Sequence, residues 1–589
     1  MDFSKVPVSH RNPDQHLDLV DVLNAAATAP VVAVDTETNG EDLRDGRGYC
    51  QGISFAYRHP RGLLSHYMPF RHRFGENLEK QYLEQLREVL KFRESQGFPN
   101  VYHNLKFDLE SLGTIGVVIG GTADYCTMMM SYLLNENIYS QSLNSTSKHW
   151  IDDPGKKDSP EFKRWTDKHG WDTIPSPEMY EYASYDADLT LRLFEHLHPK
   201  FKAEGLEGYW IGKRQIINIV RAMERRGIKI DVPLSERMAY IGDEQLEDIR
   251  EILGRNPGSN KDLAHLLLTE LGLPIVKVTP TGNPSFDKYA MEEYDEMLER
   301  RDNDTAKLIR AYRGWQKAVS SNYKPYVALL SPDGRLRPNY KLHRTKTGRW
   351  SCESPNLQQI PKKSLHPWNG EMKKVFIEDP GWTLYEGDYS QLELRLATHY
   401  SRDASLMELF ADDTRDIFTE MAEKTGLTRN DQKTLVYTIQ YGGGIRRIKN
   451  VFNVDALTAE QMRAQFFAGY PGFKNASNLA SSTAKKNKRI KLWSGRYRHF
   501  RFVDEEAHKA FNSACQGGAA DIVEGTMRRL YDTVDGSDCK MLLQVHDSVV
   551  FAVRDEVAHE VLPEIKRVME DVQPDFGIRF RVDVHRWGS

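Results

Sequence analysis

The sequence contains few cysteines, no long apolar run and almost no excess of charge of either sign. Its five cysteines lie far apart and none forms a C-x-x-C pair, which argues against a zinc or disulfide framework and favours a reducing compartment. No run approaches the roughly 18 apolar residues of a membrane helix, and the N-terminal residues lack the apolar core of a signal peptide. We therefore expect a cytoplasmic protein without a membrane partner.

Length and local charge indicate a multidomain protein with basic surfaces. The 589 residues suggest about four domains, and contents of 40% hydrophobic and 28% charged residues are ordinary for a globular protein. The net charge of −4 does not indicate nucleic-acid binding, but two segments do. Residues 335–363 hold eight basic residues against one acid, and residues 485–501 hold eight and no acid. Because both contain tyrosine and tryptophan, we interpret them as phosphate-contacting and base-stacking surfaces rather than merely solvated faces.

Acidic residues follow predicted strands in the N-terminal third. Asp35 and Glu37 come after a short apolar run, and residues i and i+2 of a strand share one face. Asp108 begins a predicted helix after a second short strand, and Tyr182 and Asp186 lie four apart on one helical face. A D-x-E pair alone is common by chance. Four acids from three segments, however, can hold two hard cations through oxygen ligands, with the tyrosine orienting a water.

The segments that follow these acids are predicted to be loops and helices. Residues 138–175 are expected to form an exposed loop region, and Asp188 is expected to be a surface acid. Apolar residues at helical spacing predict a helix that ends before Gly227. Residues 256–261 predict a loop before a helix start, which locally is typical of a plain capping loop; the family resemblance given below implies instead a thumb tip that grips DNA phosphates.

Two further acids lie at predicted strand ends in the C-terminal half. Asp388 directly follows a strand-like run and precedes a helix-like pattern, so taken alone it is typical of a turn acid. Asp547 lies at the tip of a predicted hairpin over residues 541–553. Carboxylates on two adjacent strands can hold two Mg²⁺ ions about 3.5–4 Å apart.

One predicted helix carries a stripe of basic and aromatic residues. Arg429, Lys433, Tyr437 and Tyr441 are each four residues apart, so they form one slowly drifting stripe. Basic residues followed by aromatic ones suit a triphosphate followed by a sugar and base. An amphipathic helix with a basic edge is the alternative that this spacing leaves open.

The order of the N-terminal motifs resembles that of the proofreading 3′→5′ exonucleases. The patterns are D-x-E, N-x-x-x-D and Y-x-x-x-D. The resemblance implies an RNase H-like αβ fold and two-metal phosphodiester hydrolysis. It implies that two Mg²⁺ ions are bound by Asp35, Glu37, Asp108 and Asp186, with Tyr182 beside the attacking water. A degenerate domain kept for its structure is the alternative.

The C-terminal motifs resemble those of family A DNA polymerases. Residues 347–361 match T-G-R-x-S…P-N-L-Q-x-I-P, residues 388–395 match D-Y-S-Q-x-E-L-R, and residues 223–231 match M-E-x-x-G-I-x-x-D. The resemblance implies two Mg²⁺ ions, for which Mn²⁺ can substitute, bound by Asp388, the Tyr389 carbonyl and Asp547. It implies dNTP binding by Tyr389, Gln391, Glu393, Arg429, Lys433 and Tyr437. It implies DNA contacts by Arg349, Asn356, Gln358, Tyr441, Asn512, Gln516 and His546.

The same resemblance implies separate tasks for the dNTP-binding residues. Arg429 and Lys433 would hold the incoming phosphates. Tyr437 would stack at the sugar and base, and a tyrosine there implies tolerance of 2′,3′-dideoxynucleotides. Glu393 would press against the sugar and reject a 2′-hydroxyl.

Three positions depart from the family pattern. Ser548 stands where the family usually has Glu after the hairpin Asp, which predicts retained activity with a changed metal preference. Phe418 stands where the family often has His as an extra phosphate contact, so its loss would affect triphosphate affinity and not catalysis. His508 stands where the family usually has Arg, so the template contact that the resemblance implies there would be changed.

We therefore expect an α+β multidomain chain with an exonuclease domain followed by a right-hand polymerase. The expected domains are the RNase H-like 3′→5′ exonuclease (1–205), thumb (206–330), first part of the palm (331–404), fingers (405–505) and second part of the palm (506–589). The expected function is template-directed DNA synthesis with proofreading, for replication of phage or small-replicon DNA, because exonuclease motifs starting near residue 30 leave no room for a 5′-nuclease domain.

Other functions and several partners are also open from the sequence. The alternatives are a repair polymerase, a single-subunit RNA polymerase relative, and a DNA-binding scaffold with inactive sites. The expected partners are primer–template DNA and dNTPs, with a helicase–primase or a processivity factor as further candidates. We expect a monomer in the cytoplasm of a bacterium or a phage-infected host.

Overall fold

The computed structural model describes most of the chain, in two compact units. The described residues are 19–155, 160–279, 281–360, 367–412, 415–572 and 575–588, so Lys362 and Lys363 of the predicted basic segment lie outside them. Unit 1 comprises Met1–Arg225, Tyr340–Ser351 and Leu479–Thr533. Unit 2 comprises Arg226–Asn339, Cys352–Asn478 and Val534–Ser589. Within the described ranges, no helix has the length and apolar character needed to cross a membrane.

Unit 1 is built on a five-stranded mixed sheet in the order β3-β2-β1-β4-β5. The first three strands are antiparallel neighbours, whereas β4 and β5 run parallel to β1. The strands are β1 (Val32–Thr38), β2 (Cys50–His59), β3 (Gly62–Pro69), β4 (Asn100–Tyr102) and β5 (Tyr125–Cys126). This sheet agrees with the αβ exonuclease fold expected from the N-terminal motifs.

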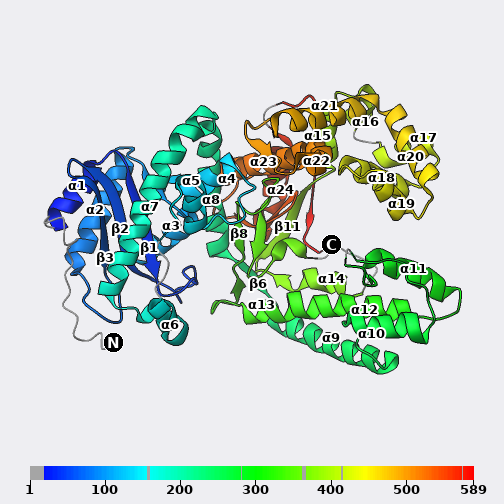
Figure 1. Ribbon diagram of the computed structural model, residues 1–589, viewed down its shortest axis with the longest axis horizontal. Coiled ribbons are helices and arrows are strands. Elements are labelled where there is room, and N and C mark those ends of the chain that lie inside the picture. Colours follow the sequence, from blue (N-terminus) through cyan, green and yellow to red (C-terminus); the bar gives the residue numbers. More distant parts are fainter. Residues whose placement is uncertain are drawn as a thin grey trace. The chain divides into compact units, whose positions relative to one another are not determined.

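Helix α7 covers one face of this sheet and lies against β1, β2 and β3 (Figure 1). Small residues allow the close approach, because Ala187 and Leu191 of α7 pack with Ala33 and Ala56 of the strands. The helices of this part are α1 (Leu19–Thr28), α2 (Lys80–Ser95), α3 (Leu105–Thr114), α4 (Thr127–Leu134), α5 (Leu143–Ile151), α6 (Pro160–His169), α7 (Ser176–Ala203) and α8 (Glu207–Arg226). The helix predicted to end before Gly227 is thus confirmed.

The prediction of an exposed loop region over residues 138–175 is wrong for much of its length. Helices α5 and α6 form there, and Ser142 caps α5 by accepting a hydrogen bond from the Ser145 N–H at 3.4 Å. Among the described residues, the segment before α5 and the turn around Asp152, whose φ of 55° is left-handed, are loops as predicted.

The rest of unit 1 comes from later parts of the chain. A short hairpin, β12 (Arg489–Lys491) and β13 (Tyr497–His499), is followed by α22 (Val503–Glu506) and the long α23 (Ala510–Thr533). A salt bridge between Arg496 and Asp521 ties the hairpin to α23, with both side chains 4% exposed. Tyr340–Ser351, the segment with the T-G-R motif, also belongs to unit 1 and runs from β8 (Asn339–Lys341) to β9 (Ser351–Glu353).

Unit 2 contains a four-stranded sheet in the order β14-β15-β11-β16. The strands are β14 (Cys539–Val545), β15 (Ser548–Arg554), β11 (Trp382–Tyr389) and β16 (Val582–Arg586), and all neighbours are antiparallel. The hairpin predicted over 541–553 is therefore confirmed. Helix α24 (Ala558–Glu570) packs tightly on one face, since a Cβ at Gly387 would meet the Met569 sulfur at 2.6 Å.

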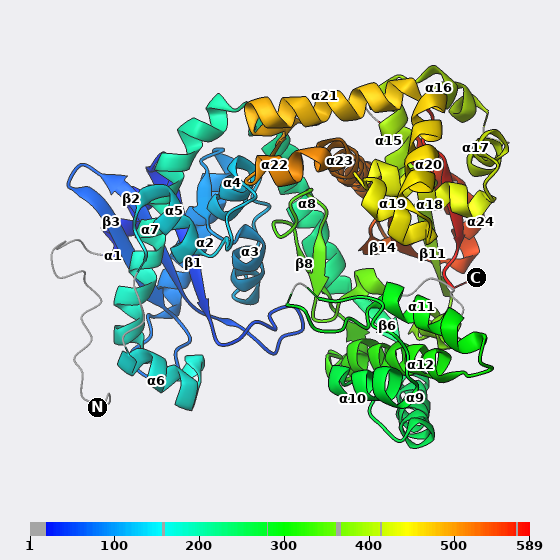
Figure 2. The same cartoon turned by 45° about the vertical axis from the view of Figure 1, so that its right-hand side comes forward.

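A helical cluster and a small sheet form another part of unit 2 (Figure 2). The helices are α9 (Val232–Leu253), α10 (Asn260–Ala264), α11 (Lys288–Glu299), α12 (Thr305–Ala318) and α13 (Lys324–Ala328). Helix α12 packs against both α9 and α11. The predicted loop before α10 is confirmed, with Ser259 as its cap. The small sheet has the order β10-β6-β7 and consists of β6 (Ile228–Ile230), β7 (Arg335–Leu336) and β10 (Phe376–Ile377).

The remaining helices of unit 2 follow β11 in the sequence, apart from α14 (Pro367–Lys374), which precedes β10. They are α15 (Leu392–Ser401), α16 (Ala404–Ala411), α17 (Ile417–Thr425), α18 (Arg429–Gln440), α19 (Ile445–Phe452) and α20 (Ala456–Gly469), followed by α21 (Pro471–Asn487). Helix α17 packs on α18 and on α20. Side-chain caps mark the starts of several of these helices, such as Thr428 at α18.

Candidate active sites

Strand β1 and helix α7 bring three of the predicted exonuclease acids together. Asp35 and Glu37 lie two residues apart on β1, and Asp186 comes from the middle of α7. One carboxylate oxygen from each of the three lies within 4.8 Å of the others, which is close enough to hold a metal ion. The alternation of the strand and the packing of α7 on the sheet thus create an acidic cluster.

The fourth predicted acid, Asp108, lies near this cluster but is not one of its three mutually close ligands. It is 2% exposed in the first turn of α3, and the Thr36 hydroxyl donates to its Oδ1 at 2.9 Å. Its Oδ2 has no hydrogen-bond partner within the protein. A buried carboxylate oxygen without a donor is costly, so this oxygen is suited to a cation.

Crowding of these carboxylates disfavours their ionised forms. Burial and the charges of Asp108, Glu37 and Asp186 raise the pKa of Asp35 well above its ordinary value. Burial, with the charges of Asp186 and Asp108, raises the pKa of Glu37 to about 8. Burial also raises the pKa of Asp108 to about 7, against the hydrogen bonds from Thr36. Hard divalent cations take such oxygen donors and would relieve the repulsion, so the residues fit divalent metal binding.

Tyr182 lies one turn before Asp186 on α7, as the spacing predicts. Its ring meets the Trp171 ring edge-on, with centroids 5.6 Å apart. Trp171 also hydrogen-bonds Glu37, so this indole links the tyrosine to the acids. Sequence reasoning missed Trp171, because no motif spacing connects it to either partner. Asp188 instead pairs with Arg192, in agreement with its predicted surface role.

The second pair of predicted acids lies at adjacent strand ends in unit 2. Asp388 is on β11 directly opposite Ser548 in the register with β15. Asp547 occupies the turn before β15, and its carbonyl accepts a hydrogen bond from the Tyr389 N–H at 3.2 Å. The turn is tight because His546 adopts a left-handed φ of 57°. Both carboxylates are half-buried, and as oxygen donors on neighbouring strands they fit hard divalent cations.

Helix α18 brings an aromatic residue to this pair. Burial raises the pKa of Tyr437, and the charges of Glu393 and Asp547 add to the effect, together with the Tyr441 hydroxyl. The charges of two carboxylates from different elements thus act on the Tyr437 hydroxyl. Glu393 is 5% exposed in the first turn of α15, which begins after Gln391 in a left-handed conformation with a φ of 56°.

The predicted stripe along α18 forms, with its basic end exposed. Arg429 forms an ion pair with Asp416 at 2.7 Å, and the Lys433 ammonium lies 5.7 Å from the centre of the Phe418 ring. Tyr441 follows α18 and is 45% exposed, with its ring 5.9 Å from that of Tyr437. The ring of Phe418, which departs from the family pattern, thus lies within cation–π range of both the Arg429 and the Lys433 side chains.

The predicted DNA-contacting residues fall in both units. In unit 2, Asn356 caps a short 3₁₀ helix and Gln358 is 6% exposed, donating to the Gln544 side chain on β14 at 2.7 Å. His546 is exposed in the hairpin turn. Gln544 was not predicted, because its role depends on the pairing of distant segments. The structure places Gln358 beside the hairpin that carries Asp547.

In unit 1, the predicted DNA-contacting residues are Arg349, Asn512 and Gln516. Asn512 and Gln516 lie one turn apart on α23 and are half-buried. Arg349 is half-buried in the segment between β8 and β9, where the Thr345 hydroxyl donates to its carbonyl at 2.6 Å. Burial lowers the pKa of His508, which precedes α23.

Taken together, the two acidic sites define a chain with an exonuclease domain followed by a polymerase domain. The chain belongs to DNA polymerase family A, because the model of that family matches residues 233–588. A 3′-5′ exonuclease model matches residues 11–202.

Known relatives agree with this assignment. The chain is 31% identical over 435 residues to "DNA polymerase I, thermostable" of Thermus filiformis, covering 69% of this chain and 51% of that protein. It is 25% identical over 573 residues to "DNA polymerase I" of Pseudomonas aeruginosa, covering 92% and 61% respectively. The chain thus spans about half to three fifths of the length of these relatives.

A solved structure has the same fold. The POL domain of Pol1 from M. smegmatis, in complex with DNA primer-template and dNTP, superposes with a TM-score of 0.82 and covers 97% of both chains. The identity is 21%, so this likeness concerns the fold alone.

Proposed function

We propose that the chain catalyses template-directed DNA synthesis by adding dNTPs to a primer 3′-hydroxyl. The observation that carries the proposal is the position of Asp388 and Asp547 at adjacent strand ends in unit 2. Two Mg²⁺ ions held by the two acids and the Tyr389 carbonyl would activate the primer hydroxyl and stabilise the leaving pyrophosphate. Mn²⁺ can substitute for them. Family membership and the relatives named DNA polymerase I support the same function.

The side chains of α18 and α15 divide the task of binding the nucleotide. Arg429 and Lys433, which lie at the exposed start of α18, bind the triphosphate. Tyr437 stacks at the sugar and base, while the buried Glu393 excludes a 2′-hydroxyl. Gln391, Asn356, Gln358, Tyr441 and His546 complete the contacts of unit 2 with nucleotide and DNA. Arg349, Asn512 and Gln516 supply the contacts of unit 1.

We also propose that the N-terminal part removes mismatched primer ends by 3′→5′ hydrolysis. Asp35, Glu37 and Asp186, together with Asp108, hold two Mg²⁺ ions that would supply a nucleophilic water. Tyr182 orients that water. The expected domain boundaries, from exonuclease (1–205) through thumb, palm and fingers, belong to this proposal. The proposal also includes primer–template DNA as the partner, a monomeric state, and action in the cytoplasm of a bacterial or phage-infected cell.

Primer extension by an Asp388→Asn variant tests the synthetic activity. The substitution keeps the shape of the side chain but removes its charge, so extension should fall by about 100–1,000-fold, as for loss of a central electrostatic group. Asp555→Asn is a matched control, because Asp555 lies at the opposite end of β15 and bonds Thr383. Unchanged extension by Asp388→Asn would refute the proposal.

Selection of the sugar separates this function from that of an RNA polymerase relative. Because Glu393 is buried in the first turn of α15 and its charge acts on Tyr437, dNTPs should be incorporated in strong preference to rNTPs. A preference for rNTPs would favour the RNA polymerase alternative. Extension of a primed long circular template by the chain alone would distinguish replication from repair, since short products indicate a missing processivity factor.

A further inference from the structure

Strand β11 carries a second buried acid, Glu386, two residues before Asp388. The two side chains point to the same face of the sheet, because alternate residues of a strand share a face. Glu386 is 3% exposed and lies opposite Val550 on β15 and His585 on β16. No step of the proposed reaction uses it, yet burying a carboxylate is expensive unless it is paired.

Both oxygens of Glu386 have partners from other elements. The Ser548 hydroxyl donates to Oε1 at 2.8 Å, and the Lys373 ammonium donates to Oε2 at 2.8 Å. The Lys373 ammonium lies 4.1 Å from the centre of the Trp587 ring, which shields the ion pair from water. The Trp587 indole N–H in turn donates to the Lys373 carbonyl at 3.1 Å. Glu386 is therefore held in one orientation.

The position of Ser548 connects this carboxylate to the polymerase site. Ser548 directly follows Asp547 and lies opposite Asp388 in the register, so it shares the face of Asp388 and Glu386. Its hydroxyl thus joins the strand that carries one proposed catalytic acid to the turn that carries the other. The structure thus places the Glu386 carboxylate within one hydrogen bond of the residue that follows Asp547.

We propose that Glu386 is the third acidic group of the polymerase site, supplied by β11 instead of by the hairpin, and that it acts with Ser548 as a positioning pair. The inference rests on the proposed polymerase function. Glu386 fixes the turn that presents Asp547 relative to Asp388, while the Lys373 ammonium offsets its charge. Partners that orient metal-binding acids typically change metal affinity or activity by about 10–100-fold when removed.

Exchanging the two side chains tests this pair directly. The variants are Glu386→Ser, Ser548→Glu and the double variant, each in a chain that also carries Asp35→Ala and Glu37→Ala so that the exonuclease acids bind no metal. Mn²⁺ binding is titrated by electron paramagnetic resonance, and kcat is measured by single-nucleotide primer extension. Glu386→Ser should weaken Mn²⁺ binding and lower kcat by about 10–100-fold. Ser548→Glu alone should also impair both, because two carboxylates then meet.

Recovery in the double variant is the decisive result. Moving the acid across the strand pair should restore Mn²⁺ affinity and kcat to within about threefold of the parent, because one carboxylate and one hydroxyl again face each other. The inference is overturned if Glu386→Ser leaves both quantities unchanged. It is also overturned if the double variant is as impaired as the worse single variant.

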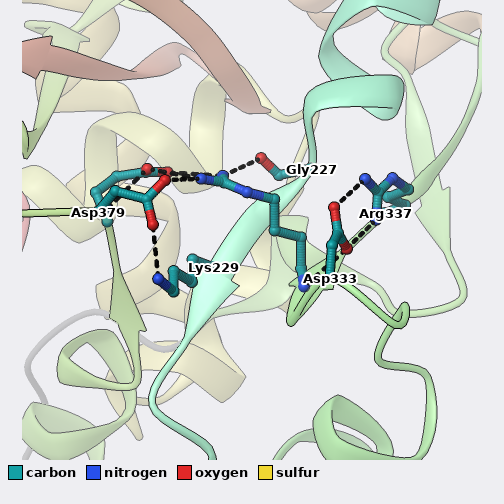
Figure 3. Close-up of polar contacts among 7 residues, drawn as sticks. Gly227, Lys229, Asp333, Arg337 and Asp379 are labelled. Carbon is teal, nitrogen blue, oxygen red and sulfur yellow. Dashed lines mark hydrogen bonds and ion pairs between the residues drawn. The ribbon is translucent and has the colours of Figure 1, made fainter. Parts of the chain in front are cut away.

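A second buried ion pair in unit 2 provides a matched control. Glu378, whose side chain is 5% exposed, accepts from Arg335 at 3.1 Å within the polar cluster that Figure 3 shows with Lys229 and Asp379. Glu378→Ser should lower the melting temperature as much as Glu386→Ser does, without changing Mn²⁺ affinity. An equal loss of Mn²⁺ affinity would show a general effect of removing buried charge and would overturn the inference.

The outcome for Asp388→Asn separates this inference from the proposed function. If that variant is inactive while the Glu386 variants match the parent, only the role of Glu386 fails. If Asp388→Asn extends primers normally, the polymerase function itself fails.

Discussion

The ion pair between Asp416 and Arg429 competes with the proposed binding of the triphosphate. Asp416 accepts from the Arg429 Nε at 3.1 Å and from its terminal nitrogen at 2.7 Å. The Arg429 hydrogen bond lowers the pKa of Asp416 from 3.8 to about 2. To bind a phosphate of the dNTP, the Arg429 guanidinium must break or share its hydrogen bonds to the Asp416 carboxylate. Replacing Asp416 by asparagine should therefore strengthen dNTP binding.

The size of the effect follows from the exposure of the pair. If the whole pKa shift of Asp416 were interaction energy with its partners, that energy would be about 2.4 kcal/mol. The side chains of Arg429 and Asp416 are 49% and 42% exposed. Solvent screening therefore reduces the interaction energy of the pair to roughly 0.5–1 kcal/mol. Asp416→Asn should thus lower the KM for dNTP by about 2–5-fold, with kcat within about twofold. Asparagine also preserves the cap of α17, where Asp416 accepts from the Thr419 N–H at 2.8 Å.

The pH dependence of the pair can be stated with its sign. Because the folded-state pKa of Asp416 is below its ordinary value, the stabilisation is present above about pH 4 and is lost as the pH falls through about 2. Assays between pH 6 and 9 therefore all report the intact pair, and the effect of Asp416→Asn on KM should be constant across that range.

Steady-state single-nucleotide incorporation at low and high salt measures this prediction. The difference in KM should shrink at high salt, because screening weakens exposed ion pairs. Asp455→Asn is the matched control: Asp455 caps α20 through the Thr458 N–H and hydroxyl, both at 2.9 Å, in the way that Asp416 caps α17. An unchanged or higher KM for Asp416→Asn would refute the competition, and would mean that Asp416 instead positions Arg429 for phosphate.

Three further predictions concern the exonuclease site, sugar selection and stability. Asp35→Ala with Glu37→Ala should abolish trimming of a mismatched primer end while leaving synthesis within about twofold; trimming that persists in a gel assay would contradict the metal assignment. Tyr437→Phe should lower incorporation of 2′,3′-dideoxynucleotides relative to dNTPs by about tenfold, the value of one hydrogen bond, and an unchanged ratio would remove the role of its hydroxyl. Arg93→Met should destabilise unit 1 by about 3–5 kcal/mol in denaturant unfolding. Arg93 is 0% exposed and donates to backbone carbonyls of four residues, so a smaller loss would mean that these carbonyls find other donors.

Local periodicity explains why much of the architecture was predictable. The pair Asp35 and Glu37 follows from the two-residue alternation of a strand, and Tyr182 with Asp186 from the four-residue spacing of a helix. The hairpin that presents Asp547 was predictable from two apolar runs around a polar turn. The family followed from motif order, and the match of the family model confirmed it.

The loop prediction over residues 138–175 failed for a physical reason. Its polar, glycine-containing sequence lacks a strong apolar stripe, yet α5 packs against both α4 and α7. Tertiary packing supplied the stabilisation that the local sequence does not show. Trp171 was missed for a related reason, because its hydrogen bond to Glu37 joins segments that are far apart in the sequence.

By itself, the sequence determined the order of the motifs and the family, and it predicted the candidate acids of both sites, since these depend on residue type and short spacings. Only the tertiary structure decided that the Oδ2 atom of Asp108 has no hydrogen-bond donor. It also decided that Arg429 forms an ion pair with Asp416. It also decided that Ser548 meets Glu386. Those contacts depend on strand register and helix packing, which bring together residues between 13 and 162 positions apart. No pattern within one segment encodes such a pairing.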